Sequence, residues 1–192
     1  MKNTLIISGH PRLSQSISNR LILEHLITIP GVIISDIMTN NPEGIIDVDT
    51  EQKKLLDADL VIFQFPFHWY GPPSHMKAWI EKVFSFGFAY GEGGNYLKGK
   101  KLLLSVTLGG SRKAYSAEGQ HQHPVETFLL PLELFAQYCG MQYLSPVYSY
   151  DMGPGKDDNP ATMTEKVRHH AGRVETIINS FMLSAHLTGR DD

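Results

Sequence analysis

Short apolar runs recur along this chain and are separated by longer amphipathic stretches. Residues 5–7 and 60–65 form such runs, and residues 102–106 form a third with one polar interruption. Runs of this length without polar alternation are typical of strands buried on both faces of a sheet. Residues 32–34 and 141–148 are two further candidates, so the pattern predicts five strands.

The stretches between these runs carry apolar residues at helical spacing. The stripes are Ile22, Leu26 and Ile29; Met76, Trp79, Ile80 and Val83; residues 132–139; and Val167, Ala171, Val174, Ile178 and Phe181. Asp49 with Gln52 resembles a capping box, which predicts the start of one more helix. Gly140 is suited to end the helix before it, and Pro146 places the fifth strand at a sheet edge because proline donates no ladder hydrogen bond.

Alternating strands and helices predict an α/β fold, with a parallel sheet covered by helices on both faces. Five strands favour the order 2-1-3-4-5, in which ligands bind beside the carboxyl ends of strands one, three and four. At 192 residues with 42% hydrophobic content, the chain suits one buried core, so we expect a single domain over residues 1–192.

Composition narrows the function further. The formal net charge of -3 leaves no bulk basic surface for a nucleic acid. Cys139 is the only cysteine, which excludes an internal disulfide and a thiolate metal cluster and fits a reducing compartment. We expect it to act as a small buried hydrophobe. The N-terminus resembles neither a signal peptide nor a membrane span. We therefore expect a soluble cytoplasmic protein, unless a partner holds it at the inner face of the membrane.

The loop after the first strand, residues 9–19, is rich in hydroxyl groups. Ser14, Ser16 and Ser18 precede or open a helix, and a helix N-terminus with added hydroxyl donors favours a phosphate group. Simple capping of the helix is the alternative, and it is favoured when the loop is taken alone. The loop contains neither a Walker A motif nor G-x-G-x-x-G.

The loop after the third strand, residues 64–73, is aromatic and bounded by prolines. Aromatic faces at the carboxyl end of a sheet favour a flat heteroaromatic ligand. Burial of Phe67, Trp69 and Tyr70 in the core or in a dimer interface is an equally good interpretation.

The loop after the fourth strand contains the pair Gly109 and Gly110, where the backbone can approach a ligand closely. Tyr115 and His121 follow and supply a hydroxyl donor and a group that titrates near neutral pH. Together they are suited to stabilise developing negative charge.

Nine histidines raise the question of a metal site, but His121 with His123, and His169 with His170, lack the supporting ligands that would complete a coordination shell. We therefore expect no metal. His169 and His170 fall in the polar part of the last helix, where we expect both to be solvated.

Several segments in order resemble the flavodoxin-like NAD(P)H:quinone oxidoreductases, in particular the ancillary oxidoreductases of glutathione-gated potassium efflux systems. The segments are Gly9-His10-Pro11 with Ser16 and Asn19; Phe67-His68-Trp69-Tyr70; Lys77-x-Trp79-Ile80-x-Lys82-Val83-Phe84; Gly87-Phe88-Ala89-Tyr90-Gly91; Ser105-Val106-Thr107-Leu108-Gly109-Gly110; and Tyr115 with His121. The resemblance covers nearly the whole chain. It implies a flavodoxin-like three-layer sandwich.

The resemblance also implies a flavoenzyme that passes hydride from NAD(P)H to a quinone or other small aromatic acceptor. FMN is favoured, with FAD as the alternative. The residues implied to bind the flavin are His10, Ser16, Ile17, Ser18, Asn19, Phe67, His68, Trp69, Tyr70, Thr107, Leu108, Gly109 and Gly110. Tyr115 and His121 would be catalytic. Tyr90 would reach the site of the partner subunit, which implies a homodimer.

Two positions depart from the pattern of this family. His68 stands where relatives commonly have Gln, and Leu108 replaces the second Thr of a Thr-Thr-Gly-Gly run. Both changes bear on acceptor preference and redox tuning. The same resemblance leaves open a regulatory subunit that activates a potassium efflux transporter, with redox activity secondary. A simple electron carrier is the third alternative, against which Tyr115 and His121 argue.

Overall fold

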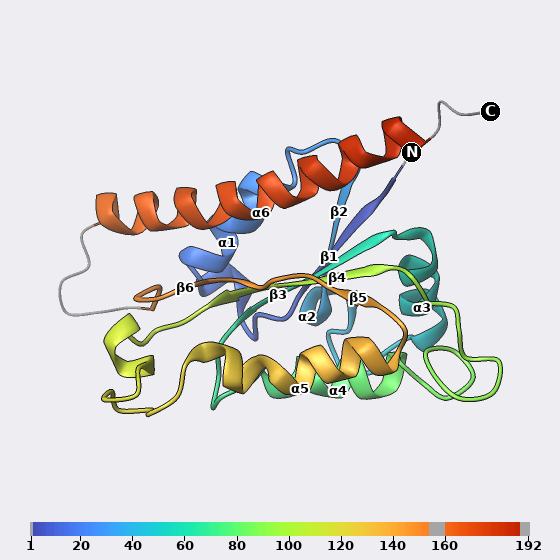
Figure 1. The fold of residues 1–192 in the computed structure, drawn as a ribbon, viewed down its shortest axis with the longest axis horizontal. Helices are drawn as coiled ribbons and strands as arrows, with labels where there is room; N and C mark the ends of the chain where they lie inside the picture. The colour runs from blue at the N-terminus through green and yellow to red at the C-terminus, as the bar shows by residue number, and fades with distance from the viewer. Residues whose placement is uncertain (1, 154–159, 189–192) are drawn as a thin grey trace.

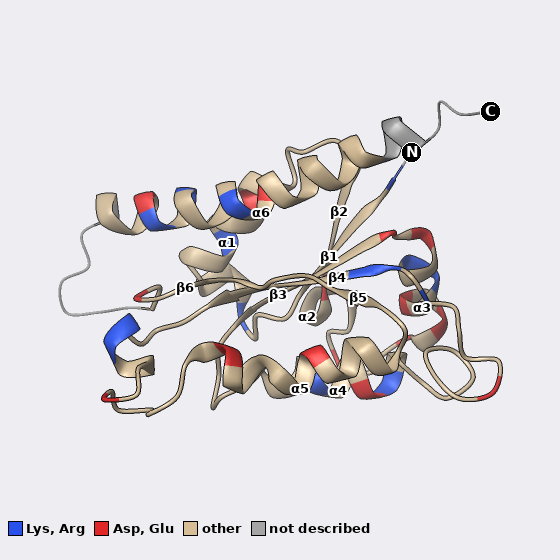
Figure 2. Ribbon diagram, in the orientation of Figure 1, with Lys and Arg blue, Asp and Glu red and all other residues tan. Residues whose placement is uncertain are grey.

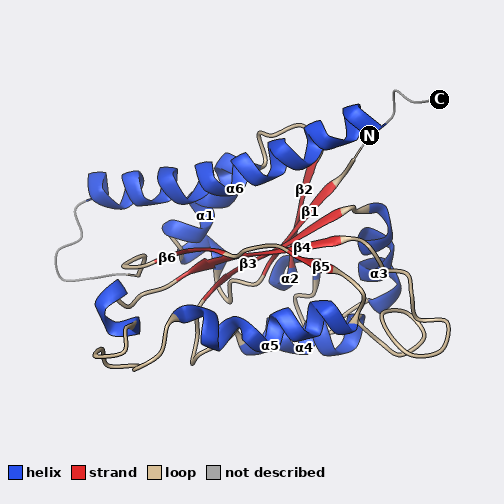
Figure 3. Ribbon diagram, in the orientation of Figure 1, coloured by secondary structure: helices blue, strands red, loops and turns tan. Residues whose placement is uncertain are grey.

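The chain forms one parallel sheet that is flanked by helices. The computed structural model describes residues 2–153 and 160–188. Its strands are β1 (Thr4–Ser8), β2 (Val32–Asp36), β3 (Leu60–Pro66), β4 (Lys101–Thr107), β5 (Gln142–Tyr143) and β6 (Val147–Ser149). They lie in the order β2-β1-β3-β4-β5, with β6 also paired to β4 (Figure 3). The predicted order and the flavodoxin-like fold are therefore confirmed.

The fifth strand differs from its prediction. Residues 141–148 divide into β5, which pairs with the start of β4, and β6, which pairs with its end. Pro146 lies in the break, where its missing N–H cannot contribute to a ladder. The sheet edge was thus predicted correctly, but the number of strands was not.

Helices cover both faces of the sheet. They are α1 (Ser18–Leu26), α2 (Ile37–Asn40), α3 (Val48–Asp57), α4 (Ser74–Val83), α5 (Val125–Tyr138) and α6 (Pro160–Thr188). In Figure 1, α1 and α6 lie on one side of the sheet and α4 and α5 on the other. Charged residues gather on the helices and loops, while the strands carry few (Figure 2).

The helix boundaries correct two predictions and add one helix that was not predicted. The cap of α3 is Asp47, whose carboxylate accepts a hydrogen bond from the Thr50 amide at 3.1 Å, so the predicted Asp49–Gln52 box is wrong. α5 begins at Val125, well before the predicted residue 132, and contains Pro131. The single turn α2 is too short for its periodicity to show in the sequence.

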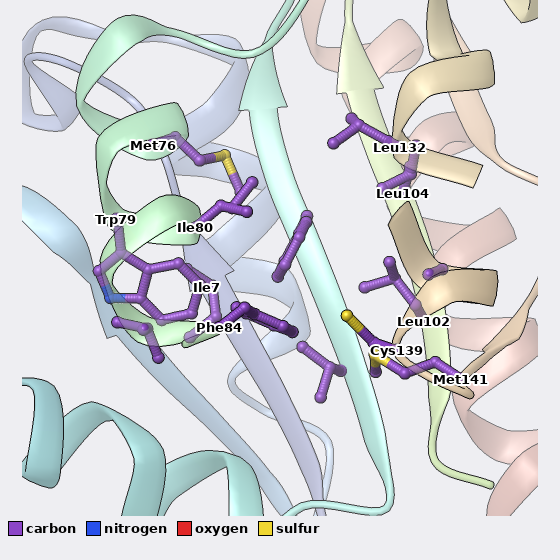
Figure 4. Close-up of a cluster of buried hydrophobic side chains, with 14 of the residues drawn as sticks. Ile7, Met76, Trp79, Ile80, Phe84, Leu102, Leu104, Leu132, Cys139 and Met141 are labelled. Atoms are coloured by element: carbon purple, nitrogen blue, oxygen red, sulfur yellow. The ribbon is translucent and has the colours of Figure 1, made fainter. Parts of the chain in front are cut away.

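Successive strand residues face opposite sides and fill two cores. Ile7 and Phe63 point toward α4 and α5, whereas Ile6 and Ile62 point toward α1 and α6. Figure 4 shows the first core, with Trp79 and Phe84 on one side of β3 and Leu104 and Cys139 on the other. Cys139 is buried, as predicted, and burial raises the pKa of its thiol to about 11.

One histidine of the last helix was predicted wrongly. His169 is exposed, but His170 is completely buried. The hydroxyls of Ser105 and Ser149 lie on either side of its ring, each 2.8 Å from a ring nitrogen. They satisfy both nitrogens, which allows the ring to be buried. Within the described part of the chain, no helix is long and apolar enough to cross a membrane.

Candidate functional site

The carboxyl ends of β1, β3 and β4 meet at one edge of the sheet. Strand register places Ser8 opposite Gln64 and Gln64 opposite Ser105, so the three following loops begin side by side. A cavity of about 500 Å³ opens there. Its volume falls in the range of pockets that bind small molecules.

Five segments that are separate along the chain line this cavity. The wall consists of His10, Gln15, Ser16, Ile17, Ser18 and Asn19; Pro66, Phe67 and His68; Thr107, Gly109, Met152 and Gly153; and Met163 and Thr164. Cavities of similar size occur beside β6 and α6 and beside α3, but neither is lined by the loops after β1 and β3. The first cavity is therefore the candidate site.

The first loop places five predicted residues on the wall. Ser16 Oγ accepts a hydrogen bond from the Asn19 amide at 3.1 Å, so Ser16 does cap α1 while it lines the cavity. His10 Nδ1 accepts one from the Arg12 amide at 3.0 Å, which leaves Nε2 to carry the proton. Burial, with His68 as the next cause, lowers the pKa of His10, so its ring is neutral at pH 7. The first loop thus contributes a neutral imidazole, hydroxyl groups and the start of α1 to the cavity wall.

The aromatic loop is divided by a tight turn. His68 and Gly71 exchange two backbone hydrogen bonds, and Trp69 and Tyr70 between them have φ of 43° and 68°. Positive φ at two consecutive non-glycine residues is strained, and strain of this kind concentrates at functional sites. Phe67 and His68 face the cavity, whereas Trp69 is 95% exposed and Tyr70 lies outside the wall.

Only some of the predicted residues in the third loop face the cavity. Thr107 and Gly109 line the cavity, but the Leu108 side chain lies in the core. The Leu108 amide donates to Ser149 O and its carbonyl accepts from the Met152 amide, so neither group faces a ligand. Gly110 packs against the Tyr115 ring.

Tyr115 and His121 lie together, one ring removed from the cavity. Their ring centroids are 4.3 Å apart, and Phe67 of the cavity wall is 6.0 Å from Tyr115. Tyr70 Oη lies 3.3 Å from His121 Nδ1. Burial, followed by the neighbouring Tyr70 and Tyr150, raises the pKa of Tyr115. Its hydroxyl therefore remains a hydrogen-bond donor at neutral pH.

Several site residues had no signal in the sequence. Phe128 of α5 stacks on Tyr70 at 5.0 Å and meets the rings of Phe67 and Tyr115 edge-on, which completes an aromatic cluster. Met163 reaches the cavity because α6 packs beside α1, and the loop residues Met152 and Gly153 reach it because β6, which precedes them, pairs with β4. Only the tertiary fold brings these segments together.

Tyr90 is half-buried and lies outside the cavity wall. Its ring packs against Phe86 at 6.0 Å and Tyr138 at 5.5 Å. The neighbouring Phe88 is buried in the core, whereas Phe86 and Tyr96 are exposed.

Comparison with known proteins places the fold and site in context. A family model described as "flavodoxin-like fold" matches residues 2–173. The chain is 37% identical over 147 residues, 77% of its length, to a Bacillus subtilis protein named "Uncharacterized NAD(P)H oxidoreductase YrkL", of which it covers 84%. It is also 37% identical to the glutathione-regulated potassium-efflux system ancillary protein KefF of Enterobacter sp. (strain 638), over 88% of this chain and 94% of that protein.

Two solved structures are similar along their whole length. General stress protein 14 of Treponema denticola, in complex with FMN, has a TM-score of 0.83 and 30% identity, with 91% of this chain and 98% of that chain covered. An NADPH-quinone reductase of P. pentosaceus has a TM-score of 0.77 and 25% identity, with 88% and 95% covered. The order of the strands and the helices on both faces of the sheet define a flavodoxin-like α/β protein. The chain belongs to the flavodoxin-like fold family.

Proposed function

We propose that this protein is a flavin-dependent oxidoreductase that takes hydride from NAD(P)H and passes the electrons to a quinone-like acceptor, with FMN in the candidate cavity. The observation that carries the proposal is one cavity lined both by Ser16 to Asn19, where α1 begins, and by Phe67 and His68 of the aromatic loop. The relatives named as NAD(P)H oxidoreductase and NADPH-quinone reductase and the FMN complex of a similar fold support it.

The residues present fit FMN. Ser16, Ser18 and Asn19 lie where α1 begins, and the N-terminus of a helix favours a phosphate. Gly109 and Gly153 approach so closely that a Cβ on Gly153 would lie 3.1 Å from Gly109 Cα. Their bare backbones therefore form one wall, against which a flat ring can lie. No extended adenine-binding segment accompanies this cavity in the described chain, which favours FMN over FAD.

When bound, the flavin supplies the hydride chemistry, and the protein supplies orientation and electrostatics. Phe67 and His68 would flank the ring system, and Phe67 would exclude water from it. Tyr115, whose hydroxyl stays protonated, would donate to a centre that gains negative charge. His121 beside it would share that charge, with Tyr70 Oη close to its Nδ1.

A regulatory role is the second candidate, because the KefF relative is an ancillary protein of a potassium-efflux system. In that case the chain would bind and activate a transporter, and electron transfer would be secondary. Efflux measured in cells that express a flavin-free variant separates the two functions. Full activation without flavin would favour the regulatory role.

The proposed enzyme activity is tested by its two half-reactions. Under anaerobic conditions NAD(P)H should bleach the visible absorbance of the bound flavin, and a quinone should restore it. Ser16→Asp replaces the capping hydroxyl with a carboxylate, which can still cap α1 but repels a phosphate, so FMN binding should weaken at least about tenfold. Ser14→Asp, on an exposed serine outside the cavity, is the matched control. The proposal would be contradicted if neither NADH nor NADPH reduced the flavin bound to the wild-type protein.

A further inference from the structure

A chain of buried polar side chains runs from α6 under the candidate cavity to the first loop. Beginning at β6, its members are Ser149, His170, Ser105, Gln64, Asn19 and Ser16. All but Ser149 are nine-tenths or more buried. The chain therefore links the last helix to the residue proposed to meet the phosphate, across β4 and β3.

The amide groups fix the direction in which hydrogen bonds are donated. Gln64 Nε2 donates to Asn19 Oδ1 at 2.8 Å, so Gln64 Oε1 is free to accept from the Ser105 hydroxyl. Ser105 Oγ, its proton used, must accept from His170 Nε2, 2.8 Å away. His170 Nδ1 is then bare and accepts from the Ser149 hydroxyl.

The same direction continues to the cavity. Asn19 Nδ2 donates to Ser16 Oγ at 3.3 Å and to Thr107 Oγ1 at 3.0 Å, and the Asn19 amide also donates to Ser16 Oγ. Both lone pairs of Ser16 are therefore occupied by donors. Its hydroxyl proton has to point elsewhere, and Ser16 lies on the cavity wall.

We propose that His170 is a positioning residue: held as the Nε2–H tautomer, it sets the direction of donation along this chain and so presents the Ser16 hydroxyl as a donor to the phosphate of the cofactor. Hydrogen bonds aligned in one direction polarise each other, which strengthens the last donor. The identity of the ligand in this inference rests on the proposed function. The direction of the hydrogen bonds along the buried polar residues does not.

The opposite direction has a distinct signature. If both amides were reversed, Ser105 would donate to His170 Nε2, and the ring would carry its proton on Nδ1. Asn19 would then present its oxygen to Ser16, whose proton would be consumed there. A nitrogen–proton correlation spectrum of the full chain labelled with nitrogen-15 histidine distinguishes these tautomers. We expect the Nε2–H form of His170 in the wild-type protein.

Binding measurements test the consequence for the cofactor. FMN and riboflavin share the ring system and differ in the phosphate, so their affinity ratio isolates the phosphate contact. His170→Phe keeps a flat ring but neither nitrogen, and it should weaken FMN about tenfold while riboflavin binding stays unchanged. His170→Gln keeps a donor and an acceptor and should retain the wild-type ratio. His169→Phe, on the exposed neighbour, is the control.

Three results would overturn the inference: an Nδ1–H tautomer in the wild type, an unchanged ratio in His170→Phe, or an equal loss of FMN and riboflavin. The last would show damage to the fold rather than to the phosphate contact. If His170→Phe does not fold, the wild-type tautomer and the ratio in His170→Gln decide. A wild-type protein that binds neither FMN nor riboflavin would instead refute the proposed function. The spectrum would still report the direction of the hydrogen bonds along the buried polar residues.

Discussion

At the scale of single residues, the candidate site depends on which side chains face the cavity. The aromatic loop illustrates this, because Phe67 and His68 line the wall while the adjacent Trp69 is directed into solvent by positive φ at two positions. Sequence pattern identified the loop but gave no sign of the turn that divides it. Trp and Tyr rarely adopt this conformation, so no residue preference predicts it.

Tyr115 offers a direct test of the proposed chemistry. Tyr115→Phe removes a hydroxyl that stays protonated at neutral pH and keeps the ring contacts with Phe67 and His121. We expect quinone reduction to slow by roughly 1 to 3 kcal/mol of barrier, the range of one hydrogen bond to a charged group, while flavin stays bound. Stopped-flow reoxidation of the flavin measures this.

Tyr143→Phe, on the edge strand β5, is a suitable control for that experiment because it lies outside the cavity. Equal reoxidation rates in Tyr115→Phe and the wild type would remove Tyr115 from the mechanism.

At the scale of elements, the apolar runs predicted β1, β3 and β4, which are buried on both faces, and β2, which lies at a sheet edge and is partly exposed. The start of helix α5 was not predicted correctly. α5 begins earlier than predicted since Val125 and Leu129 supply its first buried turns, and a pattern that starts at Leu132 misses them. The buried polar chain could not be predicted from the sequence, because its members are far apart along the polypeptide and resemble solvated residues.

Burial of His170 in α6 predicts a pH dependence of stability. Burial lowers the pKa of this ring to about 3, with Arg173 and His169 adding to the effect. The unfolded chain binds the proton near pH 6.5 and the folded chain does not, so stability from the neutral ring is complete above that pH. It is lost as the pH falls toward 3, by up to about 1.4 kcal/mol per unit.

Urea unfolding between about pH 5 and pH 7 measures this slope. Since Gln does not titrate, His170→Gln should show a shallower fall in stability than the wild type, whereas His169→Gln should match the wild type. Identical slopes in the wild type and His170→Gln would show that folding does not lower the pKa of this ring.

At the scale of the whole molecule, an exposed apolar stripe suggests how two chains would meet. Leu130, Leu134 and Tyr138 follow one side of α5 and are about half exposed or more. Phe86 is 67% exposed, and Tyr90 packs between it and Tyr138. Apolar patches of this kind mark interaction surfaces. Tyr90, which the family resemblance implied would reach the partner's site, lies behind this stripe.

We expect this surface to form the predicted homodimer, in which the same stripe on each chain meets its copy. Leu134→Glu should shift the protein to a monomer in sedimentation equilibrium, because it buries a charge in that interface. Leu183→Glu, an equally exposed leucine on α6, should leave the assembly intact. A monomeric wild type, or a dimer that tolerates Leu134→Glu, would contradict this arrangement.

The central claim is that the cavity at the ends of β1, β3 and β4 holds FMN. The most direct measurement is mass spectrometry of the cofactor released from purified protein, followed by titration of the stripped chain with FMN. We predict one FMN per chain, released on denaturation and taken up again by the refolded protein. A colourless protein that takes up no added FMN would contradict the account.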